Sequence, residues 1–127
     1  MAEALAKGVT GLVPMVRVAD VQRSIDFYKL MGLEVRGSLR NSSGDLQWVC
    51  LACEGAVVMF TRANEPVIAN LQAVLFYLYS PDLIALREHL LASGVKVSGI
   101  TYPEYMLKGE ICVDDPDGYC LLIGQLG

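Results

Sequence analysis

Hydrophobic and polar residues follow one another along the chain in an order that occurs twice. The two copies are Val13–Val35 (VPMVRVADVQRSIDFYKLMGLEV) and Leu75–Val97 (LFYLYSPDLIALREHLLASGVKV), and they stay in step at a constant offset of 62 residues. In each copy an apolar stretch precedes an Asp, an amphipathic stretch and a Gly. Such self-similarity indicates two structural units of the same kind.

Each copy predicts a helix between strands. Asp20 and Asp82 can accept hydrogen bonds from the free N–H groups of a first helical turn. Gly32 and Gly94 stand where a residue in the left-handed conformation would end each helix. Apolar residues follow helical spacing between these ends, namely Val21, Ile25, Tyr28 and Met31 in the first copy and Leu83, Leu86 and Leu90 in the second.

Further strands are predicted after each helix. They are Glu34–Leu39, Leu46–Cys53 and Ala56–Arg62 in the first copy, and Lys96–Thr101, Glu110–Val113 and Tyr119–Gln125 in the second. Each copy therefore has the order βαβββ. We predict an α+β fold in which two tandem βαβββ modules form a curved, eight-stranded mixed sheet.

The length of 127 residues suits one domain with its own core. We expect an N-terminal tail over residues 1–10 and a single domain over residues 11–127. Within that domain, module one covers residues 11–62, a linker covers 63–72 and module two covers 73–125. One helix can cover only one face of each module's sheet, so the other face needs a partner, which the second copy can supply.

The first strands, VPMVRV and VLFYLY, are apolar at nearly every position, which is typical of strands covered on both faces. If Val16 and Val18 pack beneath the first helix, the alternating residues of that strand point the other way. Six residues of the two strands would then line the concave side of the sheet: Val13, Met15, Arg17, Leu75, Tyr77 and Tyr79.

The charge of the chain narrows the choice of partners. Lys and Arg number 10 and Asp and Glu number 14, giving a net charge of −4 with no basic cluster. This argues against binding to nucleic acid or to an anionic membrane surface, because both need a basic face. The N-terminal sequence lacks the apolar core of a signal peptide, and no apolar run approaches the length of a membrane span.

We therefore expect a cytoplasmic protein. Cytoplasm keeps thiols reduced, so the four cysteines are expected to be small buried apolar residues rather than disulfides. Cys50 and Cys53 form a Cys-x-x-Cys within a predicted strand, where residues three apart point to opposite faces, so packing is the expected role. His89 is the only histidine and falls in the second helix, where we expect it at the surface.

Two stretches, VRVADVQRSIDFYKLMGLEV and ICVDDPDGYCLLIGQ, together with paired modules over about Gly11 to Gln125, resemble the vicinal oxygen chelate superfamily. This superfamily includes glyoxalase I, extradiol dioxygenases, and the fosfomycin and bleomycin resistance proteins. The resemblance implies that the two modules form a cup for a small ligand. Enzymes of this family usually bind a divalent metal through His, Glu or Gln on the first and last strands of each module.

The positions that match these metal ligands carry apolar residues here. They are Val13, Leu75 and Leu122, with the fourth position at Val58, Met59 or Phe60. None is a normal ligand for a divalent cation. We therefore expect no metal, no other cofactor and no catalytic residue, and the pattern is most similar to that of the metal-free bleomycin resistance-like members.

Eight residues are candidates for contact with a ligand in the cup: Met15, Arg17, Trp48, Phe60, Tyr77, Tyr79, Cys120 and Leu122. The tyrosines with Met15 and Trp48 would make an aromatic pocket lining, or would fill the cup as core. Arg17 could hold an acidic ligand group or pair with a carboxylate such as Glu110. The loop Tyr102–Tyr105 could close over the cup. Asp115 and Asp117, in an Asp-Pro-Asp-Gly turn, have an ordinary structural explanation.

The leading hypothesis is a metal-free protein that sequesters a small apolar or aromatic molecule. The resemblance implies a homodimer with ligand sites between subunits. The alternative is an enzyme of the same superfamily (a lyase, isomerase or dioxygenase) with atypical metal ligands or metal-free acid–base chemistry. A third hypothesis is an interaction module whose cup is filled by its own side chains.

Overall fold

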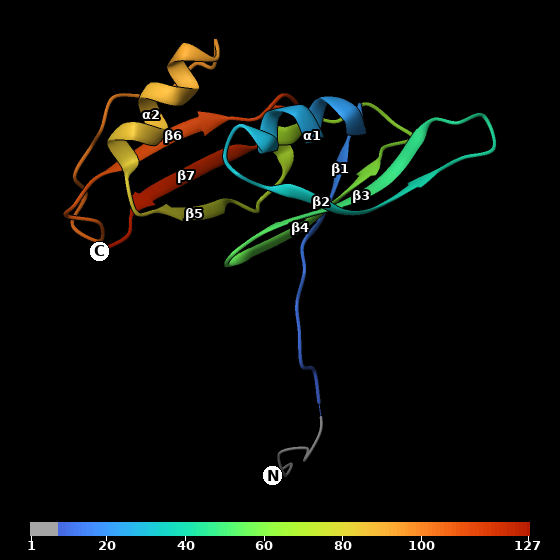
Figure 1. The fold of residues 1–127 in the computed structure, drawn as a ribbon, viewed down its shortest axis with the longest axis horizontal. Coiled ribbons are helices and arrows are strands. Elements are labelled where there is room, and N and C mark those ends of the chain that lie inside the picture. Colours follow the sequence, from blue (N-terminus) through green and yellow to red (C-terminus); the bar gives the residue numbers. More distant parts are fainter. Residues whose placement is uncertain (1–7) are drawn as a thin grey trace.

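A computed structural model describes residues 8–127; residues 1–7 of the predicted tail lie outside it. In chain order the elements are β1 (Met15–Val18), α1 (Val21–Lys29), β2 (Glu34–Arg40), β3 (Leu46–Cys53), β4 (Ala56–Arg62), a 3₁₀ turn η1 (Ala69–Leu71), β5 (Phe76–Ser80), α2 (Leu83–Ala92), β6 (Glu110–Asp114) and β7 (Cys120–Gln125). Both helices lie on the upper side of the sheets in Figure 1.

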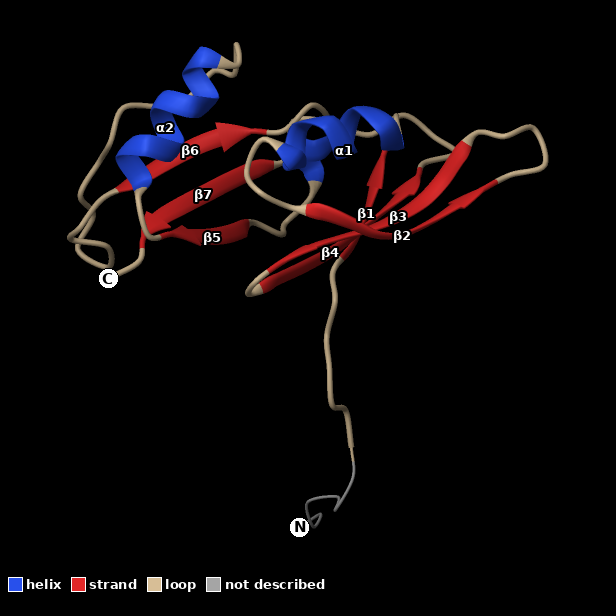
Figure 2. Ribbon diagram, viewed as in Figure 1, coloured by secondary structure: helices blue, strands red, loops and turns tan. Residues whose placement is uncertain are grey.

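The strands form two sheets (Figure 2). The first has the order β1-β4-β3-β2, in which β1 and β4 run parallel and the other neighbours run antiparallel. The second has the order β5-β7-β6, in which β5 and β7 run parallel and β6 and β7 run antiparallel. The predicted α+β class is confirmed, and the first module has the predicted βαβββ order.

The second module differs from the prediction at Lys96–Thr101, which was expected to be its second strand. In place of a strand, this segment makes isolated bridges from Val97 to Val113 and from Thr101 to Glu110. The reason lies between the bridges, because the Ser98 hydroxyl accepts the backbone N–H of Cys112 at 2.8 Å and donates to the carbonyl of Gly99. The Ser98 hydroxyl thus accepts the N–H that a backbone carbonyl would accept in a regular ladder. Gly99 beside it further weakens a strand here. Within residues 8–127 there are seven strands in two sheets, not a single sheet of eight.

The predicted helix boundaries are confirmed. The carboxylate of Asp20 accepts the backbone N–H of Arg23 at 3.2 Å, and that of Asp82 accepts the backbone N–H of Ala85 at 3.1 Å. Gly32 and Gly94, which follow the helices, have φ angles of 92° and 82°. Only glycine adopts this left-handed conformation at little cost, so these two residues turn the chain out of each helix.

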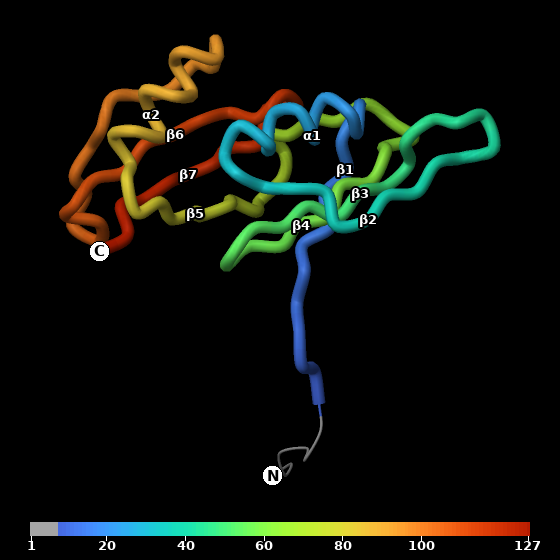
Figure 3. Tube along the Cα trace, in the orientation of Figure 1, coloured from blue at the N-terminus to red at the C-terminus, as the bar shows by residue number. Residues whose placement is uncertain are grey.

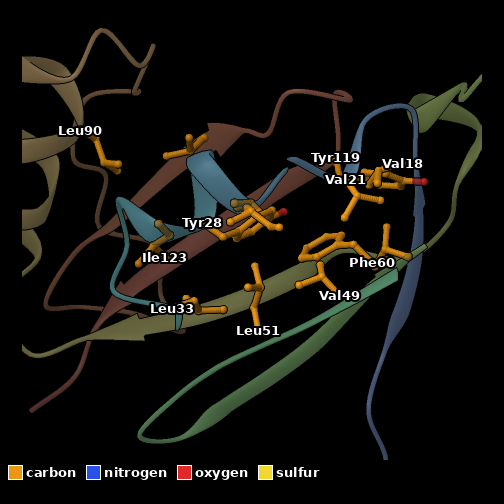
Figure 4. Close-up of a cluster of buried hydrophobic side chains, with 14 of the residues drawn as sticks. Val18, Val21, Tyr28, Leu33, Val49, Leu51, Phe60, Leu90, Tyr119 and Ile123 are labelled. Atoms are coloured by element: carbon orange, nitrogen blue, oxygen red, sulfur yellow. The ribbon is translucent and has the colours of Figure 1, made fainter. Parts of the chain in front are cut away.

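One hydrophobic core joins the two modules (Figure 4). Helix α1 contributes Val21, Ile25 and Tyr28, and the ring of Tyr28 lies 4.8 Å from that of Phe60 on β4. Helix α2 buries only Leu83 and Leu90, which join the same cluster. The trace in Figure 3 shows the turn between β6 and β7 reaching α1, so the second module closes over the first at this point.

The strand alternation predicted for β1 is confirmed. Val16 and Val18 are buried in the core, whereas Met15 and Arg17 are exposed on the opposite side of the strand. The described residues contain no helix with the length and apolar character needed to cross a membrane.

Candidate functional site

The face of the first sheet that points away from the core carries three of the predicted ligand residues, Met15, Arg17 and Trp48. Met15 lies opposite Met59 in the register, and Arg17 and Trp48 both lie opposite Thr61. Residues that are paired across strands, or two apart along one strand, share a face. We call this surface, made of Met15, Arg17, Trp48, Cys50, Met59 and Thr61, the first outer face.

The second sheet has a corresponding surface. Tyr77 lies opposite Leu122, and Tyr79 lies opposite Gly124, so the two tyrosines share a face with Leu122 and Cys120. Their ring centroids are 5.2 Å apart. We call this surface the second outer face; it is made of Tyr77, Tyr79, Glu110, Cys112, Asp114, Cys120, Leu122 and Gly124. Four predicted ligand residues therefore lie together here.

Phe60 does not lie on either outer face. It is paired with Val16 and Val49, is only 1% exposed, and belongs to the core beneath α1. The sequence left the register of this strand open between Val58, Met59 and Phe60. Because the side chains of a strand alternate, the placement of Met59 opposite Met15 sends Phe60 to the other side. Phe60 therefore does not share the face that carries Met15.

A groove of about 460 Å³ lies between the two modules. It is lined almost entirely by apolar side chains, and the segment before β1, the β3–β4 hairpin and β5 all contribute to it. Two predicted ligand residues, Phe60 and Tyr77, line this groove together with Val13. Phe60 is thus part of a concave site, although it reaches that site from the core side of its sheet.

Glu110 provides a buried carboxylate on the second outer face. Its Oε2 accepts the Tyr77 hydroxyl at 2.6 Å, and its Oε1 accepts the Tyr105 hydroxyl at 2.9 Å. Burial and this hydrogen bond raise the pKa of Tyr77. Tyr105 belongs to the loop that was expected to close over the cup, and its ring lies 6.4 Å from that of Tyr77.

Arg17 does not pair with Glu110, which was one of the possibilities for its guanidinium. The ion pairs within residues 8–127 are Arg23 with Asp117 and Arg62 with Asp45. The two phenol hydroxyls satisfy Glu110 instead, and Arg17 lies exposed on a strand of the other sheet. The sequence showed both residues, but nothing in its local pattern placed Tyr105 and Tyr77 around the carboxylate.

The positions that match the family's metal ligands are apolar in space as well as in sequence. Val13 and Leu75 are 39% and 62% exposed, and Leu122 lies half-buried between Tyr77 and Cys112. In the described part of the chain, one group of three side chains could hold a metal ion: Cys112, Asp114 and Cys120. Burial, together with the neighbouring Cys120, raises the pKa of the Cys112 thiol to about 11.

Cys112 and Asp114 were missed as candidates. The available signal was strand alternation before and after the Asp-Pro-Asp-Gly turn. Cys112 and Asp114 are two residues apart on one strand and so share a face, and Cys120, after the turn, had already been assigned to the cup. His89 is exposed on α2, as expected. All four cysteines are free thiols, but each is half-buried and not buried as predicted.

The Asp-Pro-Asp-Gly turn joins the modules. Asp115 is buried; its Oδ2 accepts the Tyr28 hydroxyl at 2.7 Å, and its Oδ1 accepts the backbone N–H groups of Asp117 and Tyr119. Asp117 accepts the backbone N–H of Ala19 at 2.8 Å. Burial raises the pKa of the Asp115 carboxyl. These carboxylates are structural, as the sequence predicted, and they connect the second module to the start and end of α1.

Comparisons with known proteins agree with this architecture. The family model for the Glyoxalase/Bleomycin resistance protein/Dioxygenase superfamily matches residues 12–123. A search of curated proteins finds no match.

Among solved structures, a bleomycin-binding protein in complex with bleomycin is 16% identical, with a TM-score of 0.72 over 94% of this chain and 100% of that one. The bleomycin-binding protein of Streptomyces verticillus, complexed with copper(II)-bleomycin, is 18% identical, with a TM-score of 0.69 over 95% and 99%. An integron cassette protein from the mobile metagenome of the Halifax Harbour sewage outfall is 26% identical, with a TM-score of 0.71 over 93% and 100%.

Proposed function

We propose that this chain, which belongs to the Glyoxalase/Bleomycin resistance protein/Dioxygenase superfamily, binds and sequesters a small apolar or aromatic molecule. In this proposal it does so without a metal at the positions where enzymes of the family hold theirs. The observation that carries the proposal is the apolar groove between the modules, with Tyr77 and Phe60 in its wall.

The groove has the size and lining that small-molecule sites need. Its volume of about 460 Å³ lies within the range of ligand pockets, which are mainly hydrophobic with a few placed polar groups. Tyr77 lines the groove, and its hydroxyl is fixed by a hydrogen bond of 2.6 Å to Glu110. Two structural neighbours are described as bleomycin-binding proteins, which favours sequestration over chemistry as the role of this fold here.

The outer faces support the predicted homodimer with ligand sites between subunits. Met15 on the first outer face and Tyr79 on the second are each 60% exposed, and Leu75, just before β5, is 62% exposed; contact with a second copy would cover such large apolar side chains. In addition, β1 and β5 are edge strands of their sheets, and an uncovered edge strand is prone to pair with another chain. A second copy would cover both features and enclose the ligand. Sedimentation equilibrium of the purified protein tests this part of the proposal, and a monomer at micromolar concentration contradicts it.

Isothermal titration calorimetry against a panel of aromatic and glycopeptide-type compounds tests the binding itself. The expected result is saturable binding of at least one compound with a negative heat-capacity change, because apolar surface is buried. Absence of binding at millimolar ligand contradicts the proposal. Mass spectrometry of the recovered ligand separates sequestration from the enzyme alternative, since a binding protein returns the compound unchanged.

A further inference from the structure

Two thiols lie side by side on the second outer face, away from the groove. The sulfurs of Cys112 on β6 and Cys120 on β7 are 3.4 Å apart. In the register Cys112 lies opposite Leu122, and Cys120 lies opposite Asp114, so the two cysteines are diagonal neighbours on one face of the hairpin. Both are half-buried, and Asp114 is exposed. One possible ligand atom from each of the three residues lies within 4.8 Å of the other two.

The spacing fits a shared metal ion better than a covalent bond. Two thiolates bound to one tetrahedral zinc at about 2.3 Å each stand roughly 3.8 Å apart. The observed separation of 3.4 Å needs only a small opening to reach this value. A disulfide would need the sulfurs to close to about 2.05 Å. The carboxylate of Asp114 completes a set of three ligands and leaves a fourth position open to solvent.

The ligand types select the ion. Thiolates favour soft or borderline ions such as Zn²⁺, Cd²⁺ and Cu⁺, whereas Mg²⁺ and Ca²⁺ prefer oxygen ligands only. We propose that Cys112, Cys120 and Asp114 form a binding site for a thiophilic metal ion of the Zn²⁺ class. Binding displaces the two thiol protons to solvent, so the ion is held by two thiolates and one carboxylate.

This site is separate from the positions that the family's enzymes use. Leu122, at one of those positions, lies opposite Cys112, and Cys120 lies two residues before it on the same strand. The metal would therefore be held beside the usual position by different residues. None of its three ligands lines the groove between the modules, so the inference does not depend on the proposed sequestration. It replaces the expectation that the chain binds no metal.

The experiment uses the full-length chain, without a metal-binding tag, reduced and freed of metal. Cd²⁺ and Zn²⁺ are added separately as the metal salts alone, Cd²⁺ binding is followed by thiolate-to-metal charge-transfer absorbance, and bound metal is counted after gel filtration. We expect one ion per chain. Cys112→Ser and Cys120→Ser should each weaken binding by about tenfold or more, and Asp114→Asn should weaken it less, because both thiolates remain.

The second cysteine pair of the chain supplies the control. Cys50 and Cys53 are also half-buried, but they lie three apart on β3 and therefore point to opposite faces. The double variant Cys50→Ser/Cys53→Ser should bind as the native chain does. Circular dichroism checks that each variant is folded. Asp114→Asn changes only an exposed side chain, so its metal affinity can be measured even if the cysteine variants do not fold.

Three results would overturn the inference. The first is no charge-transfer band and no retained metal in the native chain. The second is equal binding by the native chain, Cys112→Ser and Asp114→Asn. The third is a chain that loses two hydrogens in mass in air and, once reduced again, retains no metal, which would make the pair a disulfide site instead.

Discussion

The two modules share one sequence pattern but contribute differently to the molecule. In the first module, α1 buries Val21, Ser24, Ile25 and Tyr28 against a complete four-stranded sheet. In the second, α2 buries only Leu83 and Leu90, and the sheet has three strands with two isolated bridges. Helix α1 therefore adds more to the common core than α2 does, although the strands of both modules contribute to it, and the second module supplies the phenols, thiols and carboxylates of its outer face.

This difference teaches that a duplicated pattern need not give duplicated chemistry. The first outer face presents Met15, Met59 and Trp48 beside the guanidinium of Arg17, and Cys50 lies there opposite Met59. The second presents Tyr77, Glu110 and two cysteines that contact one another. Polar groups therefore lie on both faces, but the contacts that join phenols to a carboxylate and one thiol to another lie on the second.

The largest expected effect comes from removing an aromatic ring from each module. Phe60 is fully buried against Tyr28, so Phe60→Ala should lower the free energy of unfolding by about 3–5 kcal/mol. Phe76 is half-buried, with its ring 6.4 Å from that of Tyr119, so Phe76→Ala should cost roughly half as much. Urea unfolding measures both. Equal losses would contradict the view that the ring of Phe60 is the more completely packed of the two.

Two strand glycines offer a second contrast. A Cβ at Gly124 would lie 2.6 Å from the Met106 methyl and 2.9 Å from the Tyr77 hydroxyl, so Gly124→Ala should destabilise by about 1–3 kcal/mol through overpacking. A Cβ at Gly37, in the first module, meets only the Trp48 ring at 3.6 Å. Gly37→Ala should therefore be neutral or stabilising by about 0.5 kcal/mol. Thermal unfolding compares them, and a destabilised Gly37→Ala variant would count against this packing.

The contact between the modules can be weakened one hydroxyl at a time. Tyr28→Phe leaves the buried Asp115 carboxylate short of a donor and should cost about 1–3 kcal/mol. Tyr119→Phe removes a donor to the neutral backbone carbonyl of Arg17, 2.8 Å away, and should cost about 1 kcal/mol or less. Urea unfolding of the two variants ranks the contacts. The reverse ranking would mean that Asp115 does not depend on Tyr28.

The smallest effect concerns pH. Burial raises the pKa of Asp115, so the folded chain holds this proton more tightly than the unfolded chain does. The contribution of this carboxyl to stability is therefore greatest below its unfolded pKa of about 4, and is lost as pH rises through its higher folded pKa. The stability of the native chain relative to Asp115→Asn should fall over this range. Urea unfolding at a series of pH values checks it, and a constant difference excludes Asp115 as the source.

Much of the fold could be predicted from the sequence because its signals are local. The helices begin directly after Asp20 and Asp82 and are followed by Gly32 and Gly94, as expected, since capping depends only on the neighbouring backbone. The alternation of β1 was predictable for the same reason. The segment Lys96–Thr101 was not, because the Ser98 side chain bonds to Cys112, a partner 14 residues away.

The candidate site was predictable where it depended on alternation within one strand, and not where it depended on register between strands. Tyr77 shares a face with Tyr79, and Cys120 with Leu122, because residues two apart on one strand point the same way. The position of Phe60 needed the register between β1 and β4, which no local pattern contains. Glu110 and its two phenols, and the contact of Cys112 with Cys120, join three separate segments and emerge only in the folded chain.

Blocking the groove tests the proposed function most directly. Val13 lines the groove and is 39% exposed, so Val13→Trp can fill it without disturbing the core, while Ile84→Trp adds the same ring on the exposed side of α2. Calorimetry with the compound that binds the native chain most tightly should show the Kd raised by about tenfold or more in Val13→Trp and unchanged in Ile84→Trp. Equal affinity of all three proteins would contradict binding in the groove between the modules.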